Sequence, residues 1–583
     1  MAFQLSAGVN VSEIDLTTVV PSVSSSTGAF AGKFSWGPVN EVVTISDEVR
    51  LAQRFGRPTN TNYEYWFSAA NFLAYSNNLK VVRAAGANTT NAYDRATAAA
   101  NGGTYADAAL LIENSIDYGL NHSNLTANTV TGVDNYGSFA AKFPGELGNS
   151  IKVVLADSVT AISNTDIWST YQSQFTDKPR TSDYVKAVGG ANDEIHILVI
   201  DSAGKFTGTS NTVLEKFAFV SKASDAKNND GTSNYYKDVL NNRSNYVWWL
   251  SHTGLVANTE TTNWGTTASN TTFTSAAANV VIQLSTGSDG IIASANITTA
   301  YNQVANPDST DVSLIITGPA DDTIAKAIIE IAETRKDCVV FVSPQKANVV
   351  DNYGSESADI LSYRENLTSS SYAVMDSGWK YQYDKYNDTY RWVPLNGDVA
   401  GLCARTDLER DPWFSPAGAN RGIIKNVIKL AWNPTKANRD DLYTKGVNPV
   451  VTFAGEGTML FGDKTMLSRP SAFDHINVRR LFIVLEKSVA RAARSSLFEF
   501  NDQFTRAAFV NLVEPFLRDV QGRRGITDFR VVCDETNNTG EVIDRNEFVG
   551  DIYIKPARSI NYIQLNFVAV RTGVRFEEIV GRF

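Results

Sequence analysis

The first twenty residues alternate apolar and polar side chains with the period of two that is typical of a β-strand. The apolar positions are Val9, Val11, Ile14 and Leu16, with a break in phase between the two pairs. No second strand pattern follows closely enough to pair with them, and Pro21 and a run of serines end the segment. An unpaired strand at a terminus frays or pairs elsewhere. We therefore predict an extended N-terminal arm over residues 1–20 whose partner lies elsewhere.

Residues 27–95 carry the patterns of a compact mixed domain. The run GAFAGKFSWGPVNEVVTI predicts two strands around a Gly-Pro turn. Asp47 is placed to cap the helix EVRLAQRFG, which Gly56 closes. A second helix is predicted from about Asn62 to Tyr75, and LKVVRAA after it predicts a buried strand.

A strand, a helix and a second strand follow one another over residues 311–343, namely DVSLIIT, DDTIAKAIIEIAETR and KDCVVFVSP. This succession predicts a parallel βαβ unit with a right-handed crossover. Residues 372–470 continue with turns and short strands. We therefore predict a discontinuous α/β core domain made of residues 21–95 and 311–470.

The composition changes between the two parts of this core. Asn, Ser, Thr, Gly and Asp become frequent, notably at 121–137 and 256–278, and short strands such as IKVVLA and EIHILVI are separated by polar turns. The pattern predicts insertions that decorate a surface. We assign a β-rich outer domain to 96–185 and a second, α+β domain to 186–310. The predicted fold class is thus α/β and α+β, in several domains.

Residues 471–583 predict an α+β assembly domain. NVRRLFIVLEKSVARAARSSLFEFN has the pattern of a long amphipathic helix, and a second helix is expected from about Asp502 to Val520. FRVVCD, DIYIKP and the long SINYIQLNFVAVRTG predict strands. In the last strand Ile563, Leu565 and Phe567 share one face, and Tyr562 lies on the other. A long strand at the end of a chain can offer its edge to another chain.

Composition supports a folded chain of several domains. The 583 residues are 43% hydrophobic and 20% charged, with a net charge of -10, and domains of about 100–200 residues predict three to five of them. No apolar run approaches the roughly 18 residues of a membrane span, and the first residues lack the pattern of a secretory signal. We therefore expect no direct membrane insertion.

Charge is distributed unevenly along the chain. From Asp474 onward there are 16 Lys+Arg and 15 Asp+Glu, a net of +1, which leaves 36 against 47, or -11, for the rest. Fourteen of those 16 bases are arginine, the residue favoured in bidentate pairing and at interfaces. A nucleic-acid interface would need a strongly basic patch, so we expect no nucleic-acid partner.

The residues that carry chemistry do not form a recognisable catalytic motif. The four histidines, His122, His196, His252 and His475, and the three cysteines, Cys338, Cys403 and Cys533, lie in no H-x-x-x-H or C-x-x-C context. No G-x-S-x-G occurs, and GTMLFGDKT at 457–465 has Asp463 where a phosphate-binding loop needs lysine. We predict no enzyme, no cofactor and no metal.

A basic row lies on the long C-terminal helix. Lys487, Arg491 and Arg494 occupy positions i, i+4 and i+7. A solvated helix face is the ordinary interpretation of such a row. The alternative, a contact surface, gains weight because the row lies on an otherwise apolar helix in the least acidic part of an acidic protein.

Several stretches occur in a fixed order: GVNVSEIDLTT, GPVNEVVTISDEVRLAQRFG, AKFPGELGNSIKV, LSTGSDG, ETRKDCVVFVSP, PWFSPAGANRGII, GEGTMLFGDKTML and the long C-terminal helix. Together they resemble the tail sheath proteins of contractile-tailed bacteriophages. The resemblance covers most of the chain and is weakest across the two insertions.

The resemblance implies a mechanical function. Sheath subunits stack as six-fold rings around a tail tube, and on a baseplate trigger the sheath shortens and drives the tube through the host envelope. Neighbours exchange terminal arms by β-augmentation, which implies inter-subunit roles for the apolar positions of the N-terminal arm and for Tyr562, Ile563, Leu565 and Phe567. Lys487, Arg491 and Arg494 would face the tube. The implied partners are further copies of the chain and the tube, baseplate and tail-terminator proteins. The implied place is the virion tail, assembled in the host cytoplasm.

Other functions remain open at this point. The sheath of a related contractile device, such as a tailocin or a secretion system, would share these features, although simpler devices tend to lack the inserted domains. A receptor-binding or capsid protein is disfavoured by the βαβ core and the single long helix near the end.

Overall fold

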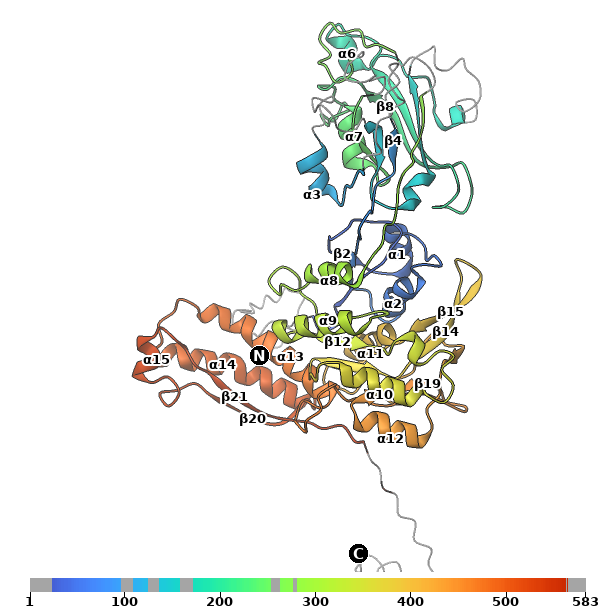
Figure 1. The fold of residues 1–583 in the computed structure, drawn as a ribbon. Coiled ribbons are helices and arrows are strands. Elements are labelled where there is room, and N and C mark those ends of the chain that lie inside the picture. Colours follow the sequence, from blue (N-terminus) through green and yellow to red (C-terminus); the bar gives the residue numbers. More distant parts are fainter. Residues whose placement is uncertain are drawn as a thin grey trace, which may run out of the picture. The chain divides into compact units, whose positions relative to one another are not determined.

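The computed structural model describes residues 24–95, 109–123, 136–157, 171–252, 263–275, 280–561 and 564. They belong to two compact units, both drawn in Figure 1. Unit 2 comprises Pro21–Pro412 and Pro416–Ser488, and unit 1 contains Trp413–Ser415 and the chain from Val489 onward. The predicted arm strands, namely Val9, Val11, Ile14, Leu16, Tyr562, Ile563, Leu565 and Phe567, lie outside the described residues.

A seven-stranded sheet forms the core of unit 2. Its order is β17-β13-β12-β11-β1-β3-β2, and only β2 runs antiparallel to its neighbour. The strands are β1 (Gly28–Gly32), β2 (Val43–Ile45), β3 (Leu79–Arg83), β11 (Leu314–Ile316), β12 (Val339–Val342), β13 (Ala373–Asp376) and β17 (Val447–Asn448). The central strands are buried on both faces, as parallel strands between helices are.

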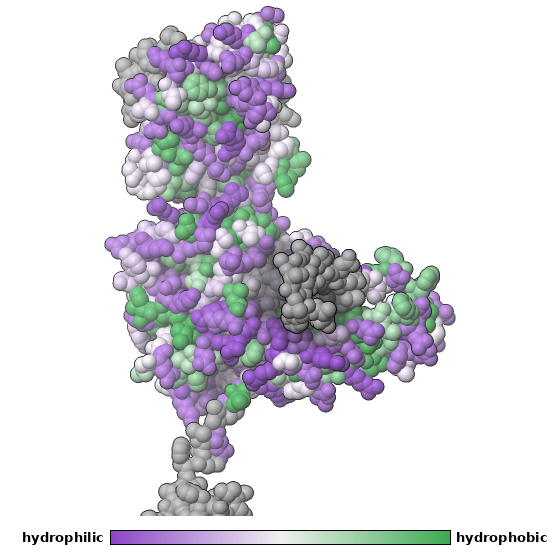
Figure 2. Space-filling view, turned by 180° about the vertical axis from the view of Figure 1, so that it is seen from behind, coloured by the Kyte–Doolittle hydropathy of each residue, from purple (hydrophilic) through white to green (hydrophobic). Residues whose placement is uncertain are grey.

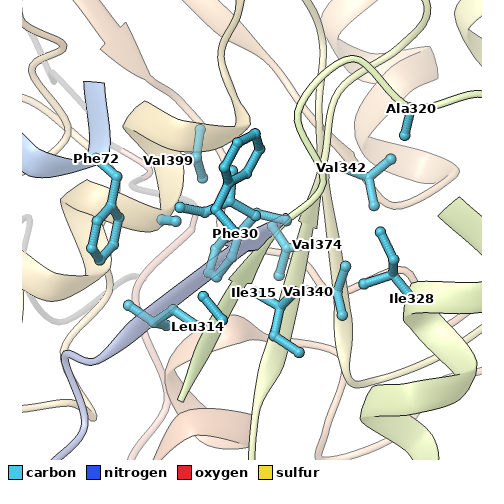
Figure 3. Packing of buried hydrophobic residues seen from close by; sticks show 14 of the residues in the cluster. Phe30, Phe72, Leu314, Ile315, Ala320, Ile328, Val340, Val342, Val374 and Val399 are labelled. Atoms are coloured by element: carbon cyan, nitrogen blue, oxygen red, sulfur yellow. The ribbon is translucent and has the colours of Figure 1, made fainter. Parts of the chain in front are cut away.

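Helices cover both faces of this sheet. On one face α2 (Tyr63–Leu73) and α11 (Asn396–Glu409) pack against each other, and α8 (Ser294–Asn302) and α9 (Asp322–Arg335) do so on the other. Figure 3 shows Phe72 and Val399 on one side of the sheet and Ile328 on the other. The two helix layers close one continuous hydrophobic core around the strands.

The local predictions for the core are confirmed. Asp47 caps α1 (Glu48–Phe55) by accepting a hydrogen bond from the Arg50 N–H at 2.8 Å, and Gly56 follows the helix with a φ of 80°. The βαβ unit forms as β11, α9 and β12, with the two strands parallel. The predicted fold class, mixed α/β and α+β in several parts, is confirmed as well.

The inserted residues build two further sheets. One has the order β10-β6-β7-β8 and the other β4-β5-β9. Their strands are β4 (Tyr93–Arg95), β5 (Tyr136–Ala141), β6 (Ile151–Asp157), β7 (Glu194–Asp201), β8 (Thr212–Ser221), β9 (Val247–Trp249) and β10 (Val280–Gln283). The helices and helical turns are α3 (Ser115–Asp117), η2 (Tyr118–His122), η3 (Glu146–Ser150), η4 (Gln172–Gln174), α6 (Asp183–Ala187) and α7 (Tyr236–Arg243).

Two of the domain boundaries expected from the sequence differ from those in the structure. The expected boundary at 185 separates β6 from β7, yet these strands pair over their whole length, from Ile151 opposite Asp201 to Asp157 opposite Ile195. The expected boundary at 310 also differs, because α8 packs on the core sheet, so the core resumes near residue 293. Both differences arise from pairing and packing between segments distant in sequence.

The rest of unit 2 follows the core sheet. It contains the three-stranded sheet β15-β14-β16 and the hairpin β18-β19. The strands are β14 (Trp379–Asp384), β15 (Thr389–Pro394), β16 (Lys429–Leu430), β18 (Val450–Phe453) and β19 (Gly457–Leu460). The helices are η5 (Lys346–Asn348), α10 (Glu356–Asn366), α12 (Lys436–Thr444) and α13 (Ile476–Ala493), and the boundary between the units falls within α13, after Ser488.

Unit 1 is an α+β unit. It contains η6 (Arg494–Ser496), α14 (Gln503–Gly522), β20 (Ile526–Val532), α15 (Gly540–Asp544) and β21 (Asp551–Pro556). The predicted second helix is confirmed, with Asp502 as its cap. The first predicted helix ends earlier than expected, at Ala493. There the Ser495 hydroxyl bonds to the Ala492 carbonyl at 2.8 Å, a local contact that competes with helical hydrogen bonding.

Candidate assembly site

The first described residues are fastened to the helix α13. The carbonyl of Ser24 accepts a hydrogen bond from the Ser313 hydroxyl at 2.9 Å, and that hydroxyl lies 3.2 Å from Nζ of Lys487. The next carbonyl, of Ser25, accepts from Arg480 at 3.3 Å. We call this set of contacts the arm root, because the predicted N-terminal arm precedes it in the chain. Both cations of the arm root come from α13.

Arg480 is the central residue of the arm root. Its side chain is 4% exposed and pairs with Asp407 of α11, which is 6% exposed. It also donates to the carbonyl of Cys403 at 3.3 Å. Burial by itself would lower the pKa of Arg480, but the Asp407 carboxylate outweighs burial and raises the pKa. The guanidinium therefore remains charged, and it links α11, α13 and the start of the described chain.

Lys487 differs from its expected outward orientation. Its side chain is 13% exposed and pairs with Asp311 at 2.9 Å and with Asp337 at 3.5 Å. It also donates to the carbonyl of Val312 at 3.0 Å. The physical reason is that two carboxylates flanking β11 and α9 attract the ammonium toward the body of unit 2.

Arg491 and Arg494 are exposed and belong to unit 1. The structure thus does not keep the predicted row together: the lysine is held within unit 2, and the two arginines are the exposed basic residues of α13 and η6. Beyond them Leu497, Phe498, Phe500 and Phe504 are also exposed. Leu497 lies within the stretch that was predicted to be one long helix, and this helix instead ends before it. Figure 2 shows apolar surface on unit 1.

The hairpin β20-β21 forms a two-stranded sheet in the described part of unit 1. The strands are antiparallel, with Phe529 opposite Ile554 and Val531 opposite Ile552. Within the described residues, neither strand pairs with a third one. Each outer edge therefore presents backbone N–H and C=O groups that can extend the sheet.

A residue that sequence reasoning missed anchors this hairpin. Trp413, from the short segment Trp413–Ser415, donates its indole N–H to the carbonyl of Arg523 at 3.1 Å. The Arg523 guanidinium lies 5.0 Å from the centroid of the indole ring. A Cβ on Gly525 would come within 3.0 Å of that ring, so glycine permits the close packing. The sequence offered only a weak signal for this contact, an aromatic residue directly after a proline in Pro412-Trp413. The residues around this pair follow neither a helical nor a strand period.

Three of the histidines, His196, His252 and His475, have structural partners within the described residues. His196 lies in β7 with its ring 2.9 Å from the Asp177 carbonyl, and burial lowers its pKa. His252 bonds to the Tyr236 hydroxyl at 2.6 Å, and burial lowers its pKa to about 4. His475, next to the start of α13, lies 3.1 Å from the Asp463 carboxylate, which raises its pKa.

The described part of the chain contains neither a cluster of metal-binding side chains nor a membrane-spanning helix. No group of three or more His, Cys, Asp or Glu side chains there could hold a metal ion. None of the helices in these ranges is long and apolar enough to cross a membrane.

Comparisons with protein families cover most of the core and of unit 1. The model of the "Phage tail sheath protein central domain" matches residues 297–466, and that of the "Phage tail sheath C-terminal domain" matches 468–569. A third, the "Tail sheath protein Gp18 domain III N-terminal region", matches 26–84. The matched segments contain the strands of the core sheet, α13 and the hairpin of unit 1.

Whole-chain relatives and solved structures agree with these matches. The tail sheath proteins of Vibrio phage KVP40 and of Enterobacteria phage T4 are each 34% identical to the chain. The matches cover 99% of this chain, and 100% and 99% of those proteins. The sheath tail protein of Listeria innocua superposes with a TM-score of 0.52 at 12% identity, over 92% of this chain and 93% of its own. The likeness to the Listeria innocua protein concerns the fold alone.

Proposed function

Because the chain belongs to the tail sheath protein family of contractile-tailed bacteriophages, and is thus a structural virion protein of a contractile sheath, we propose how it assembles and acts. Copies polymerise in the host cytoplasm as stacked six-fold rings around the tail tube. Contraction then drives the tube through the host envelope. The free energy is present from assembly, so no catalytic step is required.

The arm root is the observation that carries this proposal. Arg480 and Lys487 fasten the start of the described chain to α13, and the same helix continues into the unit that holds the hairpin β20-β21. The origin of the N-terminal arm is thus fastened to a helix whose last residues, from Val489 on, belong to the unit that contains the sheet that an arm would extend. This connection suits a mesh in which every copy both gives and receives strands.

The exchanged strands are proposed to be those predicted from the sequence: Val9, Val11, Ile14 and Leu16 in one arm, and Tyr562, Ile563, Leu565 and Phe567 in the other. They would add to the open edges of β20 and β21 of neighbouring copies. Main-chain hydrogen bonds give such β-augmentation its strength, and alternate side chains give it specificity. At each end of the tail, the unfilled edges would meet the baseplate and tail-terminator proteins.

Single substitutions in the arm test this exchange. Val11→Pro removes a backbone N–H that a strand needs, whereas Val11→Thr keeps a β-branched side chain and the N–H. We expect electron microscopy to show contractile tubes for the threonine variant and soluble subunits for the proline variant. Deletion of residues 1–16 should likewise leave soluble monomers. Intact contractile sheaths from either disrupted protein would refute arm exchange.

The tube-facing surface is proposed to be the Arg491 and Arg494 part of the basic row, with Lys487 positioning the helix from within unit 2. An acidic tube surface would pair with these arginines. Exposed ion pairs of this kind are each worth only about 0–1 kcal/mol, which suits a contact that must release during contraction.

Charge reversal separates this contact from a general charge effect. Arg491→Glu with Arg494→Glu should impair assembly on tubes. The matched control reverses Arg518 and Arg545, two exposed arginines of the same unit. Normal extended tails from the first variant would contradict the tube contact. The whole-length match to phage sheaths, insertions included, favours a phage tail over the sheath of a simpler contractile device.

A further inference from the structure

In the three-stranded sheet β15-β14-β16, one face buries polar side chains and the other carries four aromatic side chains, of which Tyr383 and Tyr390 are exposed and Tyr381 and Trp392 are partly buried. Lys380, Gln382 and Asp384 of β14 are all buried. On the opposite face of the same strands lie Tyr381, Tyr383, Tyr390 and Trp392. Antiparallel sheets with one solvated face ordinarily show the reverse alternation. An exposed apolar patch of this kind marks an interaction surface more strongly than single exposed residues do.

The four rings form one continuous aromatic face. The register places Tyr381 opposite Trp392 and Tyr383 opposite Tyr390, and the ring centroids of these pairs are 4.7 Å and 5.3 Å apart. Tyr381 also stacks on Tyr390 at 5.6 Å. At one side the exposed Lys429 of β16 lies 5.2 Å from the Tyr381 ring. We refer to these five residues as the aromatic face.

The polar side holds the aromatic face rigidly. Lys380 forms a fully buried ion pair with Asp398 of α11 at 2.9 Å. Arg391 pairs with Asp384 at 2.7 Å and bonds to Asn60 at 2.8 Å. Because these contacts fix the strands to the body of unit 2, the exposed rings of Tyr383 and Tyr390 lose little further freedom when a partner covers them. Such preorganisation lowers the cost of binding.

The tip of the hairpin is fastened as well. Lys385 lies 3.1 Å from the Glu48 carboxylate of α1, and Tyr386 donates to the same carboxylate at 3.1 Å. The Tyr386 ring packs edge-on against Trp66 of α2 at 5.2 Å. Figure 1 shows the hairpin of β14 and β15 at the edge of unit 2. The hairpin is therefore a braced platform.

We propose that the aromatic face binds an acidic surface of a second copy of the chain in the assembled sheath, which rests on the proposed self-assembly. Tyrosine and tryptophan are among the residues that dominate protein–protein contacts. Lys429 supplies a positive charge at the rim, and a neighbouring copy is acidic, since the chain outside its last 110 residues carries a net charge of -11. The contact is heterologous, joining two different patches, as a helical array requires.

A small contact of this kind is useful when many copies are already linked. Once arms hold two copies together, a second contact forms at high effective concentration and needs little affinity of its own. It can therefore break and re-form during contraction while the arms stay engaged. This gives the aromatic face a role separate from the arms and from the tube-facing arginines.

The variant Tyr383→Ser with Tyr390→Ser tests the inference. Both tyrosines are about half exposed, at 47% and 51%, so the substitutions leave the core of unit 2 intact. The matched control is Tyr353→Ser, which removes a tyrosine that is 86% exposed in a turn outside this sheet. The measurement is the concentration of unassembled protein at equilibrium with polymer. We expect it to rise at least about tenfold in the double variant, as hot-spot removal does, and to stay unchanged in the control.

Chemical labelling of tyrosine gives a second readout. In the wild-type protein, Tyr383 and Tyr390 should react in the soluble subunit and be protected in the polymer. If wild-type protein polymerises with Tyr383 and Tyr390 still reactive, and the double variant polymerises equally well, the inference is wrong and the proposed function stands. A third outcome is that host surface polysaccharide protects Tyr383 and Tyr390 of the soluble subunit from labelling, whereas polymerisation does not. The partner of the aromatic face would then be a glycan and not a second copy, and the inference would be overturned. Wild-type protein that never polymerises would overturn the proposed function and this inference with it.

Discussion

Replacement of Arg480 by methionine tests the arm root directly. Methionine fills a similar volume but carries no charge and no donor. It would leave the Asp407 carboxylate buried without its partner, and would remove a donor from the carbonyls of Cys403 and Ser25. These losses concern α11, α13 and the start of the described chain together.

The size of the effect follows from the burial of the pair. Removing one partner of a buried ion pair costs about 3–5 kcal/mol, because an uncompensated charge is left behind. The double variant Arg480→Met with Asp407→Leu removes that charge, so only the two carbonyl contacts are lost, at about 1 kcal/mol each. We therefore expect the single variant to be less stable than the double variant by about 1–3 kcal/mol.

The pH dependence gives an internal check. Burial raises the pKa of the Asp407 carboxyl even beside Arg480, and without the guanidinium the protonated form is favoured further. A carboxyl whose pKa is higher in the folded than in the unfolded state destabilises the fold as the pH rises. The penalty of the single variant should therefore shrink as the pH falls toward 4.

Hydrogen exchange measured by mass spectrometry is a suitable assay. A chain with several parts need not unfold in two states, so peptides over α13 and residues 24–30 are followed separately. In the single variant both should exchange faster, and in the double variant much less so. If the single variant matched the wild type, or if the double variant were the less stable one, the buried pair would not hold the arm root.

Two further predictions concern unit 2. Gly397→Ala should destabilise it by about 1–3 kcal/mol, because the new Cβ would lie 2.2 Å from the Ser68 carbonyl oxygen where α11 meets α2. The control Gly378→Ala has its nearest atom at 3.9 Å, and thermal unfolding should be unchanged there. The carboxylate of Asp463 raises the pKa of His475. The resulting stabilisation is fully present below pH 6.5 and is lost as the pH rises through the raised pKa. The substitution His475→Asn should remove this pH-dependent stabilisation. Unfolding free energies of both proteins across pH 5.5 to 8.5 test the sign, and a difference independent of pH would contradict it.

Local features were well predicted from the sequence. Asp47 and Gly56 mark the ends of α1 because a cap depends on a few neighbouring residues. The βαβ unit of β11, α9 and β12 was predicted because its strands and helix have distinct periods and follow one another directly. The helix α14 and its cap Asp502 were also predicted, because they too depend on neighbouring residues.

The insertions were predicted less well because strand pairing is not local. β6 and β7 are separated by more than thirty residues, yet they form one ladder. A boundary drawn between two polar stretches cannot detect such a ladder. The anchoring of β20 by Trp413 has the same cause, since the two lie more than one hundred residues apart in the chain.

By itself, the sequence determined the order of elements in the core, the caps of its helices and the family to which the chain belongs, because these depend on local patterns and on the order of segments. Only the tertiary structure decided where the charges and rings point. The alternation WKYQYD shows two kinds of side chain on two faces, but it does not say which face is buried. Asp398, contributed by another element, draws Lys380 inward, and Asp311 does the same for Lys487. The partner of a charge is found in space, and so the outward aromatic face and the arm root could be seen only there.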